Sequence, residues 1–373
     1  MSVVIVLREA SRTGPVRIAG LIAAALKEHR QVRILCIEEG GMLDWLQECV
    51  GAHNVRVIQT EGLSRQASFG ERIRSAQTIL QNEPGEIVYI NSLAPSEFIV
   101  AAKAAGKFAV LHIHENAALM RTLLAQHFTS PEVVSLCDAV VLQAANLRQD
   151  ILEVFAAVPE RTLTFGAAVD IAALDQGAQT GKVIAANAAG TRYKRSKRML
   201  IGMMGEASER KGSDIFLETA KAVREHDFMW VGTWTPGQGR ENPAYDEFFR
   251  AQLPNFFVSG SVGNPYKYMS RFDLFFLSSR DDPNPVALAE ALCLDVPILA
   301  FSRSTLVTDF LGRTSLLCHG HVNVPDAARV LKALNRPEVG LLSLKGRVKE
   351  HRRQFDIRDK ITGLVDLLAA LGA

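Results

Sequence analysis

The stretch SSRDDPNPVALAEALCLDVPILAF, residues 278–301, follows the apolar run 272–277 and ends in a second apolar run, 296–301. Between these two runs lies a helical pattern, VALAEAL, which starts after the pair Asn284-Pro285. A buried strand, a helix and a second buried strand are typical of a βαβ unit, whose two strands are parallel. The stretch therefore predicts a parallel sheet, with Asp282 in the loop that follows a strand.

Short apolar runs alternate with helical patterns along the rest of the chain as well, in two separate series. Alternation of this kind predicts repeated βαβ units. The expected strands of the first series are 3–7, 32–37, 55–58, 87–90, 108–113, 139–143 and 161–165, and those of the second are 199–205, 228–234, 255–260, 272–278, 296–301 and 314–318. The sequence therefore predicts an α/β protein of two doubly wound domains, with ligands bound in the cleft between them, beyond the carboxyl ends of the strands.

The two series also place the domain boundaries. Residues 1–170 are expected to form the first domain and residues 199–355 the second. The region 171–198 between them is rich in Gly, Ala, Thr and basic residues, so it is expected to be a linker. Residues 356–373 carry an apolar stripe at helical spacing and predict an amphipathic helix that packs back toward the N-terminal domain.

Composition narrows the class of protein. The 373 residues are 48% hydrophobic and 22% charged, which is typical of a globular chain of two domains. The net charge of +2 is too small to indicate a nucleic-acid partner. Five scattered cysteines without a CxxC pair indicate reduced thiols and no zinc site, so no metal ligands are assigned. The short N-terminal run VVIVL has no basic region before it, so we expect a strand in a cytoplasmic protein rather than a signal peptide.

The loop and helix start at 282–290 have the composition of a phosphate site. Asn284 is expected to be the N-cap and Pro285 the first helical residue. The free amides of Val286 and Ala287 would then meet a phosphate, and Glu290 would reach the hydroxyls of a ribose. Asp282, in the loop, would meet hydroxyls at the other end of a nucleotide sugar. On this stretch alone, a capping aspartate and a solvated helical glutamate explain the pattern equally well.

A second loop favours the phosphate interpretation. The strand that ends at Gly205 is followed by Arg210-Lys211-Gly212 and then by a helix opened by Ser213 or Asp214. Both loops follow strands of the same sheet, so both should face the same cleft. Arg210 can bind a diphosphate through a bidentate fork and Lys211 as a point charge, although an isolated basic loop would be unremarkable.

These residues resemble the GT-B glycosyltransferases, and within them the retaining family 4, also called glycosyl transferases group 1. The segments that carry the resemblance are GEASERKGSDIFLETAKAV, FMWVGTW and VSGSVGNPYKYMSRFDLFFLSSRDDPNPVALAEALCLDVPILAF. The family's acidic pair matches Asp282 and Glu290, which implies contacts with the donor sugar and the ribose. Its basic pair on the diphosphate matches Arg210 and Lys211. The loop beside the nucleobase matches Gly260 to Val262.

The N-terminal half resembles the family less sharply. SRTGPVRIAGLIAAAL is similar to its first loop, in which Gly14 matches the glycine that approaches the donor phosphates. VLHIHENAAL matches the loop histidine of the reaction centre, and His114 is placed there in preference to His112 because it lies nearer the strand end. A lone strand-end histidine is otherwise a structural residue. The sequence departs from the family pattern at Glu206 and Asp295, and Asp tolerates the left-handed turn expected at 295.

The resemblance implies retaining transfer of a glycosyl group (class EC 2.4) in a GT-B fold of two Rossmann-like domains, 1–170 on the acceptor side and 199–355 on the donor side. The donor is a nucleotide diphosphate sugar, of UDP or GDP type, and the acceptor is a saccharide or lipid-linked saccharide in bacterial cell-surface polysaccharide or glycolipid synthesis. The catalytic residues are then His114, Arg210, Lys211 and Asp282. No cofactor or metal is expected, since the helix start and the cations stabilise the diphosphate.

Three alternatives stay open at this point. The chain can be a degenerate GT-B partner of another transferase, as Glu206 and Asp295 suggest, or a GT-B epimerase or hydrolase of nucleotide sugars. A nicotinamide-dependent oxidoreductase is less well supported, because no GxGxxG follows the first strand. The five cations of RYKRSKR, 192–198, form either a solvated linker or a peripheral contact with an anionic membrane at the inner face.

Overall fold

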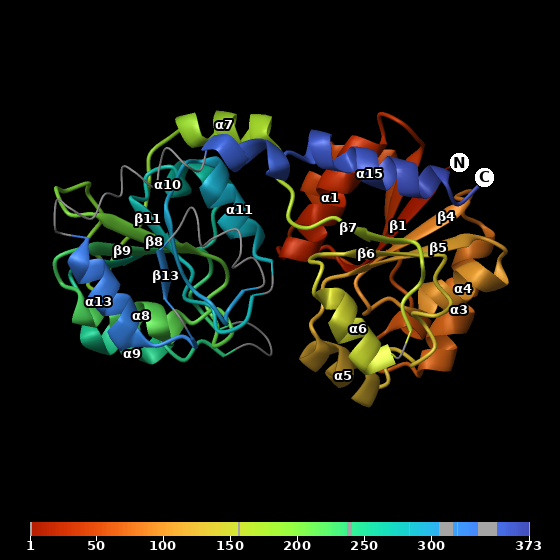
Figure 1. The fold of residues 1–373 in the computed structure, drawn as a ribbon, viewed down its shortest axis with the longest axis horizontal. Coiled ribbons are helices and arrows are strands. Elements are labelled where there is room, and N and C mark those ends of the chain that lie inside the picture. Colours follow the sequence, from red (N-terminus) through yellow and green to blue (C-terminus); the bar gives the residue numbers. More distant parts are fainter. Residues whose placement is uncertain are drawn as a thin grey trace. The chain divides into compact units, whose positions relative to one another are not determined.

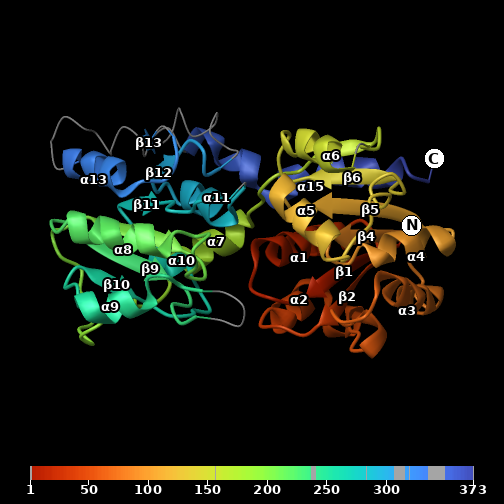
Figure 2. The ribbon, with the colours of Figure 1, turned by 90° about the horizontal axis from the view of Figure 1, so that it is seen from below.

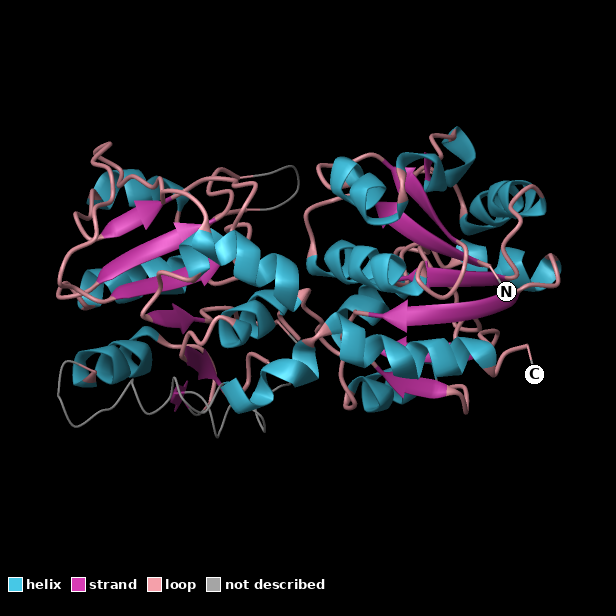
Figure 3. Cartoon of the chain, turned by 90° about the horizontal axis from the view of Figure 1, so that it is seen from above, coloured by secondary structure: helices cyan, strands magenta, loops and turns pink. Residues whose placement is uncertain are grey.

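The computed structural model describes residues 2–155, 157–236, 241–282, 284–305, 316–318, 320–334 and 349–372 (Figure 1). It divides into two compact units. Unit 1 consists of Met1–Ala168 and Ile357–Ala373, and unit 2 of Val169–Asp356. Each unit contains one parallel sheet with helices on both faces (Figure 3), so the prediction of an α/β protein with two doubly wound sheets is confirmed.

The sheet of unit 1 has seven parallel strands in the order β3-β2-β1-β4-β5-β6-β7. Five of its seven strands are apolar runs that are almost wholly buried, as expected for a parallel sheet with helices on both faces. The strands are β1 (Val3–Glu9), β2 (Val32–Glu38), β3 (Val55–Val57), β4 (Ile87–Asn91), β5 (Phe108–Ile113), β6 (Ala139–Leu142) and β7 (Thr162–Thr164). The helices are α1 (Gly14–Leu26), α2 (Leu43–Val50), α3 (Phe69–Gln81), α4 (Glu97–Ala104), α5 (Ala117–Ala125), α6 (Leu147–Phe155) and α15 (Ile357–Ala369), with short 3-10 turns η1 (Ala52–Asn54) and η2 (Glu61–Leu63).

The C-terminal helix α15 belongs to unit 1, where it packs against α1 and β7. Ile361, Leu364 and Leu368 of the expected apolar stripe are buried along this contact. Figure 1 shows α15 and α1 on one face of the sheet and α3 and α4 on the other. The last helix thus completes the cover of a sheet whose strands all come from the first half of the chain.

The sheet of unit 2 has six parallel strands in the order β10-β9-β8-β11-β12-β13. These are β8 (Leu200–Met204), β9 (Asp227–Val231), β10 (Phe256–Val258), β11 (Leu274–Phe276), β12 (Ile298–Phe301) and β13 (Leu316–Cys318). The helices are α7 (Ile171–Gln179), α8 (Ser213–Ala222), α9 (Tyr245–Ala251), α10 (Tyr266–Met269), α11 (Val286–Cys293) and α13 (Val324–Ala333), and η3 (Lys349–Phe355) is a 3-10 turn. The helices α8 and α13 pack side by side (Figure 2). All thirteen expected strands are therefore present.

The region 171–198 differs from the linker that composition predicted, because most of it is folded onto unit 2. Asp170 caps α7 by accepting a hydrogen bond from Ala173 N at 3.0 Å, and α7 packs against α10. Farther on, Ala186 forms antiparallel bridges to Arg192 and to Val258 in β10. Small residues allow this close packing. The many small residues of 171–198 therefore belong to a segment packed on unit 2, and not to a linker without contacts.

Candidate active site

The candidate site in unit 2 lies where the strand order reverses. β8 and β11 are neighbours in the sheet although β9 and β10 separate them in sequence, so the helices that follow them lie on opposite faces. The loop after β8 carries Arg210 and Lys211, and the loop after β11 carries Asp282. The sheet topology therefore brings the predicted basic pair and the predicted acid to one point at the carboxyl edge.

The two loops are joined by hydrogen bonds to main-chain oxygens. Arg280 N donates to Arg210 O at 2.8 Å, and Ser278 Oγ donates to Lys211 O at 3.0 Å. Gly212 has a φ of 66°, and a Cβ at this position would lie 2.0 Å from Ser278 O. Only glycine allows this approach without strain, which explains the Arg-Lys-Gly sequence before α8.

Asp282 is paired with the two cations. Its Oδ2 accepts from Lys211 Nζ and, at 3.3 Å, from Ser279 Oγ, while its Oδ1 lies 3.5 Å from Arg210 NH1. Asp282 is 8% exposed, and burial alone would raise its pKa. The charges of Lys211 and Arg210 and the hydrogen bonds outweigh burial and hold the pKa of this carboxyl below its usual value.

Arg280 is a residue of this site that sequence reasoning missed. Its guanidinium donates to both carboxylate oxygens of Asp214, at 2.8 and 2.5 Å, and to Glu209 O at 2.7 Å. Arg280 thereby fixes the ends of the loop that carries Arg210, whose own guanidinium donates to Asp281 O at 2.9 Å. In the sequence Arg280 stands directly before two aspartates. The sequence does not show that its partner is Asp214, which lies on another loop.

The helix α11 begins at Val286, one residue later than predicted. Pro285 is its N-cap residue, with φ of −68° and an extended ψ of 118°, and its own side chain makes no capping hydrogen bond. The prediction that Asn284 is the N-cap and Pro285 the first helical residue is therefore wrong, because the extended ψ of Pro285 delays the start of the helix to Val286. The amides of Val286 and Ala287 remain among the first-turn donors that have no acceptor within the helix.

Glu290 lies in the second turn of α11 and is only 2% exposed. Its Oε1 accepts a hydrogen bond from Tyr266 Oη at 3.3 Å. Tyr266 belongs to the short helix α10 and was not singled out from the sequence. Glu290 is therefore buried within unit 2 and hydrogen-bonded there. It is not a solvated helical glutamate, which was the alternative interpretation of the sequence.

Three glycines end neighbouring strands beside these loops. Gly205, Gly232 and Gly260 have φ values of 146°, 138° and 70°. A Cβ on Gly232 would lie 2.1 Å from Gly205 O, and Gly232 forms an antiparallel bridge to Gly260. No atom lies within 4 Å of a Cβ built on Gly260, and Val262 packs partly against the core of unit 2. The predicted nucleobase loop thus has open space at its glycine.

The two departures from the family pattern have different settings. Asp295 has a φ of 59°, so the expected left-handed turn is confirmed and aspartate occupies it. Glu206 is half-buried and follows Gly205 directly, at the start of the loop that carries the basic pair.

In unit 1, Gly14 and His114 lie at the carboxyl edge of the other sheet. Gly14 is the first residue of α1, after the N-cap Thr13. His114 follows β5, is partly exposed, and its ring centroid lies 4.1 Å from that of His112. His112 is fully buried and bonded to Tyr89 Oη at 2.7 Å. Burial lowers the pKa of His114 to about 3.

Glu115, next to His114, acts as a clamp between two loops. Its Oε1 accepts from Ser92 Oγ and from Leu93 N at 2.9 Å, and its Oε2 accepts from His114 N at 3.0 Å. Ser92 has a φ of 86°, which is unfavourable for a residue other than glycine. The buried carboxylate therefore holds a strained strand end in place, at the loop that carries His114.

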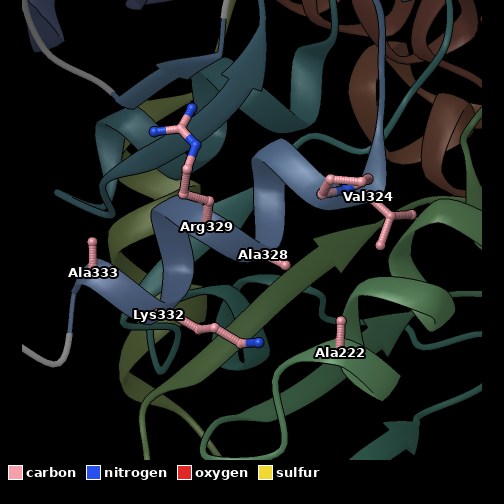
Figure 4. A pocket seen from close by; sticks show the side chains of 7 residues that line it. Ala222, Val324, Ala328, Arg329, Lys332 and Ala333 are labelled. Carbon is pink, nitrogen blue, oxygen red and sulfur yellow. The ribbon is translucent and has the colours of Figure 1, made fainter.

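Two hollows on the surface lie away from these residues. One of about 690 Å³ is lined by Ala222 at the end of α8 and by Pro325, Arg329 and Lys332 of α13 (Figure 4). None of the predicted site residues lines it. Within the described ranges, no group of three His, Cys, Asp or Glu side chains is placed to hold a metal ion, and no helix is long and apolar enough to span a membrane.

Comparisons with known proteins agree with this geometry. Residues 198–336 match the family model described as glycosyl transferases group 1. No curated protein matches the sequence. Among solved structures, HepE of Anabaena in complex with UDP-glucose has a TM-score of 0.78 at 14% identity, over 99% of this chain and 100% of that one.

Two further structures are similar over almost their whole length. Sucrose-phosphate synthase of Thermosynechococcus elongatus has a TM-score of 0.75 at 12% identity and covers 100% of this chain and 99% of its own. WaaG, a glycosyltransferase involved in lipopolysaccharide biosynthesis, has a TM-score of 0.73 at 12% identity and covers 98% and 99%. At such identities the likeness shows the fold, which is GT-B. Residues 198–336 of unit 2 thus match the group 1 glycosyl transferases, and the chain as a whole has the GT-B fold.

Proposed function

We propose that the protein transfers a sugar, with retention, from a nucleotide diphosphate sugar to an acceptor hydroxyl. The observation that carries this proposal is the junction of the loops after β8 and β11, where Arg210 and Lys211 meet Asp282 beside the start of α11. Two cations and the first-turn amides of a helix form a site for a diphosphate. Glu290, in the second turn of the same helix, would accept hydrogen bonds from a ribose.

In this mechanism the residues act by position and charge. Arg210, Lys211 and the amides of Val286 and Ala287 stabilise the departing diphosphate, while the acceptor hydroxyl attacks the anomeric carbon from the same face. These groups supply the positive charge, so the proposal includes no metal ion and no cofactor. Gly14 would let the donor phosphates approach α1 of unit 1, and His114 would lie at the reaction centre.

The pairing of Asp282 modifies the role that the resemblance implied. Both its oxygens face protein donors, and a turn of Lys211 toward the diphosphate would free this carboxylate for the donor sugar. Binding of the diphosphate would supply that turn, because it offers Lys211 a stronger anion. We infer that Asp282 is a counterion of the basic pair in the free protein and a contact of the sugar in the complex.

The donor and acceptor classes are taken from similar proteins. HepE was solved with UDP-glucose, so a UDP sugar is the first donor to test. WaaG is involved in lipopolysaccharide biosynthesis, which favours a saccharide or lipid-linked saccharide as acceptor, in bacterial surface polysaccharide or glycolipid synthesis in the cytoplasm.

Membrane contact through RYKRSKR has limited support. Arg195 is paired with Asp273 at 2.8 Å and Arg198 with Asp227 at 3.5 Å, which leaves three of its five cations without an ion pair in the described structure. Three cations contribute roughly 3 kcal/mol at an anionic surface. The segment precedes β8, at the amino edge of the sheet, whereas the basic pair lies at the carboxyl edge. A membrane bound there would face away from the donor site.

The proposal is tested by calorimetric titration with UDP, GDP, ADP and their sugar conjugates. Arg210→Gln is the first variant, because the Arg210 side chain is 55% exposed and Asp282 keeps Lys211. We expect one nucleotide to bind the wild type and Arg210→Gln to weaken it roughly 10- to 100-fold, as for a lost charge-assisted contact. Glu290→Gln should weaken it too, and Arg250→Gln on α9 should not.

The titration also separates the alternatives. If none of these nucleotides binds the wild type, the donor site is absent and the protein is a non-catalytic GT-B partner. If a nucleotide sugar binds and is turned over without any acceptor, an epimerase or hydrolase is the better assignment. Donor turnover that requires an acceptor supports the transferase.

A further inference from the structure

One buried polar residue at the carboxyl edge of unit 1 has no part in the site that the sequence predicts. Asn91 is the last residue of β4 and is only 3% exposed. In the sheet it pairs with His112 of β5, two residues before His114. β4 is also the neighbour of β1, so Asn91 lies at the switch point of this sheet, beside the start of α1.

The hydrogen bonds of Asn91 fix the orientation of its amide. Its Nδ2 donates to Pro15 O at 3.3 Å, and its Oδ1 lies 2.9 Å from His114 Nε2. A carbonyl oxygen only accepts, so the NH₂ end of the amide must face Pro15. The carbonyl end therefore faces the ring, and the hydrogen of this bond must belong to His114 Nε2.

Burial keeps the ring of His114 neutral at neutral pH, because it lowers the pKa of this histidine. The ring of His112 lies tilted against it, with the ring centroids 4.1 Å apart, and the two nitrogens of His112 are bonded to Tyr89 and Gln143 at 2.7 and 3.3 Å. Glu115 is the adjacent carboxylate, and it accepts from the main-chain amide of His114. A neutral ring with its hydrogen on Nε2 has a lone pair on Nδ1, and within the described residues no hydrogen bond is made to Nδ1.

We propose that Asn91 is a positioning residue that holds His114 as the Nε2-protonated tautomer, with Nδ1 as the acceptor for a substrate hydroxyl. The substrate part of this inference rests on the proposed function, in which His114 lies at the reaction centre. His114 then accepts a hydrogen bond from a sugar hydroxyl and donates no proton to the leaving group. Asn91 also ties the histidine to Pro15, the residue after Gly14, so the predicted phosphate loop and His114 are set by one side chain.

Histidine tautomers can be observed directly by NMR of the protein labelled with ¹⁵N-histidine, with His114 assigned from its absence in His114→Gln. In the wild type we expect His114 to be neutral and protonated on Nε2 at neutral pH. Asn91→Leu keeps the volume but not the amide, so both tautomers should appear. Asn91→Asp places a carboxylate on Nε2 and should raise the pKa of His114 by roughly 1–3 units.

The matched control is Asn82→Asp. Asn82 is exposed at the end of α3, before β4 begins, and donates to Thr78 O at 3.1 Å. Asn82→Asp introduces the same charge at the other edge of the sheet, so the pKa of His114 should be the same as in the wild type. Circular dichroism of each variant shows whether unit 1 is folded, and Asn91→Asp, which keeps the shape of the side chain, gives a result even if Asn91→Leu does not fold.

The inference is overturned if His114 of the wild type is protonated on Nδ1 or charged at neutral pH, or if Asn91→Asp leaves its pKa unchanged. These spectra need no donor or acceptor, so they decide the tautomer even where no transfer is detected and the proposed function itself fails. Where transfer is detected, Asn91→Leu should lower kcat about 10-fold and leave KM for the donor within about twofold. A loss confined to KM would show that Asn91 acts only in binding, against the proposal.

Discussion

Removal of one charge from the Lys211–Asp282 pair should destabilise unit 2 more than removal of a lysine whose acidic partners are more exposed. The Lys211 and Asp282 side chains are 17% and 11% exposed, so the pair is largely shielded from water. Lys211→Met keeps most of the stem and deletes the charge. The carboxylate of Asp282 then retains only Ser279 and the more distant Arg210.

The loss of stability in Lys211→Met depends on which partners of Asp282 remain. Loss of one partner of a buried ion pair costs about 3–5 kcal/mol when the other charge is left alone. Here Ser279 and Arg210 still face the carboxylate, so we expect about 2–3 kcal/mol. For a unit of this size that loss lowers Tm by roughly 5–10 °C. Lys221→Met is the control, because its partners Glu218 and Glu247 are 48% and 29% exposed and such pairs contribute at most about 1 kcal/mol.

Urea unfolding followed by tryptophan fluorescence measures this difference. Trp230 and Trp234 are buried in unit 2, at 0% and 5% exposed, and report its unfolding, whereas Trp45 belongs to unit 1. The double variant Lys211→Met/Asp282→Asn should regain part of the lost stability, since it no longer buries an unpaired charge. The reasoning is refuted if Lys211→Met and Lys221→Met unfold within about 0.5 kcal/mol of each other, well inside the range of surface substitutions.

The pH dependence supplies an independent check with a defined sign. The pKa of Asp282 is lowered in the folded wild type, so this group contributes stability above its unfolded pKa of about 3.9, and the contribution is lost as the pH falls through the folded pKa. Without Lys211, burial dominates and should raise that pKa. The deficit of Lys211→Met is therefore greatest at neutral pH and should shrink as Asp282 of the variant becomes protonated.

Three further substitutions test local geometry by thermal unfolding. Gly212→Ala places a Cβ 2.0 Å from a main-chain oxygen and should cost more than 2 kcal/mol, whereas Gly190→Ala, which also has positive φ but open space, should cost about 1 kcal/mol; equal losses would contradict the clash. Glu115→Ala removes the acceptor of three strand-end donors and should cost about 2–4 kcal/mol, and a loss under 1 kcal/mol would show that the clamp is not needed. Asp295→Val should cost about 1–2 kcal/mol because its φ is 59°, while Asp295→Gly should not, and the reverse order would exclude the left-handed turn as the cause.

The sequence predicted the sheets well because parallel strands are buried on both faces. Such strands appear as apolar runs, and VVIVL, IVYI and FAVLHI coincide with β1, β4 and β5 to within two residues. The C-terminal helix was predictable for the same reason, since its apolar stripe needed a surface. Both features depend on local pattern alone, which is what a single sequence displays.

The pairings within the sites were not predictable in the same way. Lys211 and Asp282 lie 71 positions apart, and they meet because β8 is next to β11. Nothing in either loop specifies that strand order. The predicted N-cap was wrong by one residue, because the sequence does not show that Pro285 has an extended ψ and stays outside α11. Asn91 could not be identified as a site residue from the sequence, because asparagine is common where a strand passes into a loop.

Both units build their predicted sites by the same physical device. In each sheet, two strands distant in sequence are neighbours, β1 with β4 and β8 with β11, and the segments after them are joined by hydrogen bonds. Asn91 joins one pair through Pro15, and Arg280 joins the other through Arg210. These contacts between segments thus position the charged and polar side chains of each predicted site. Specificity for donor and acceptor can therefore change through residues at the substrate, while the loop junctions that hold the reacting groups stay the same.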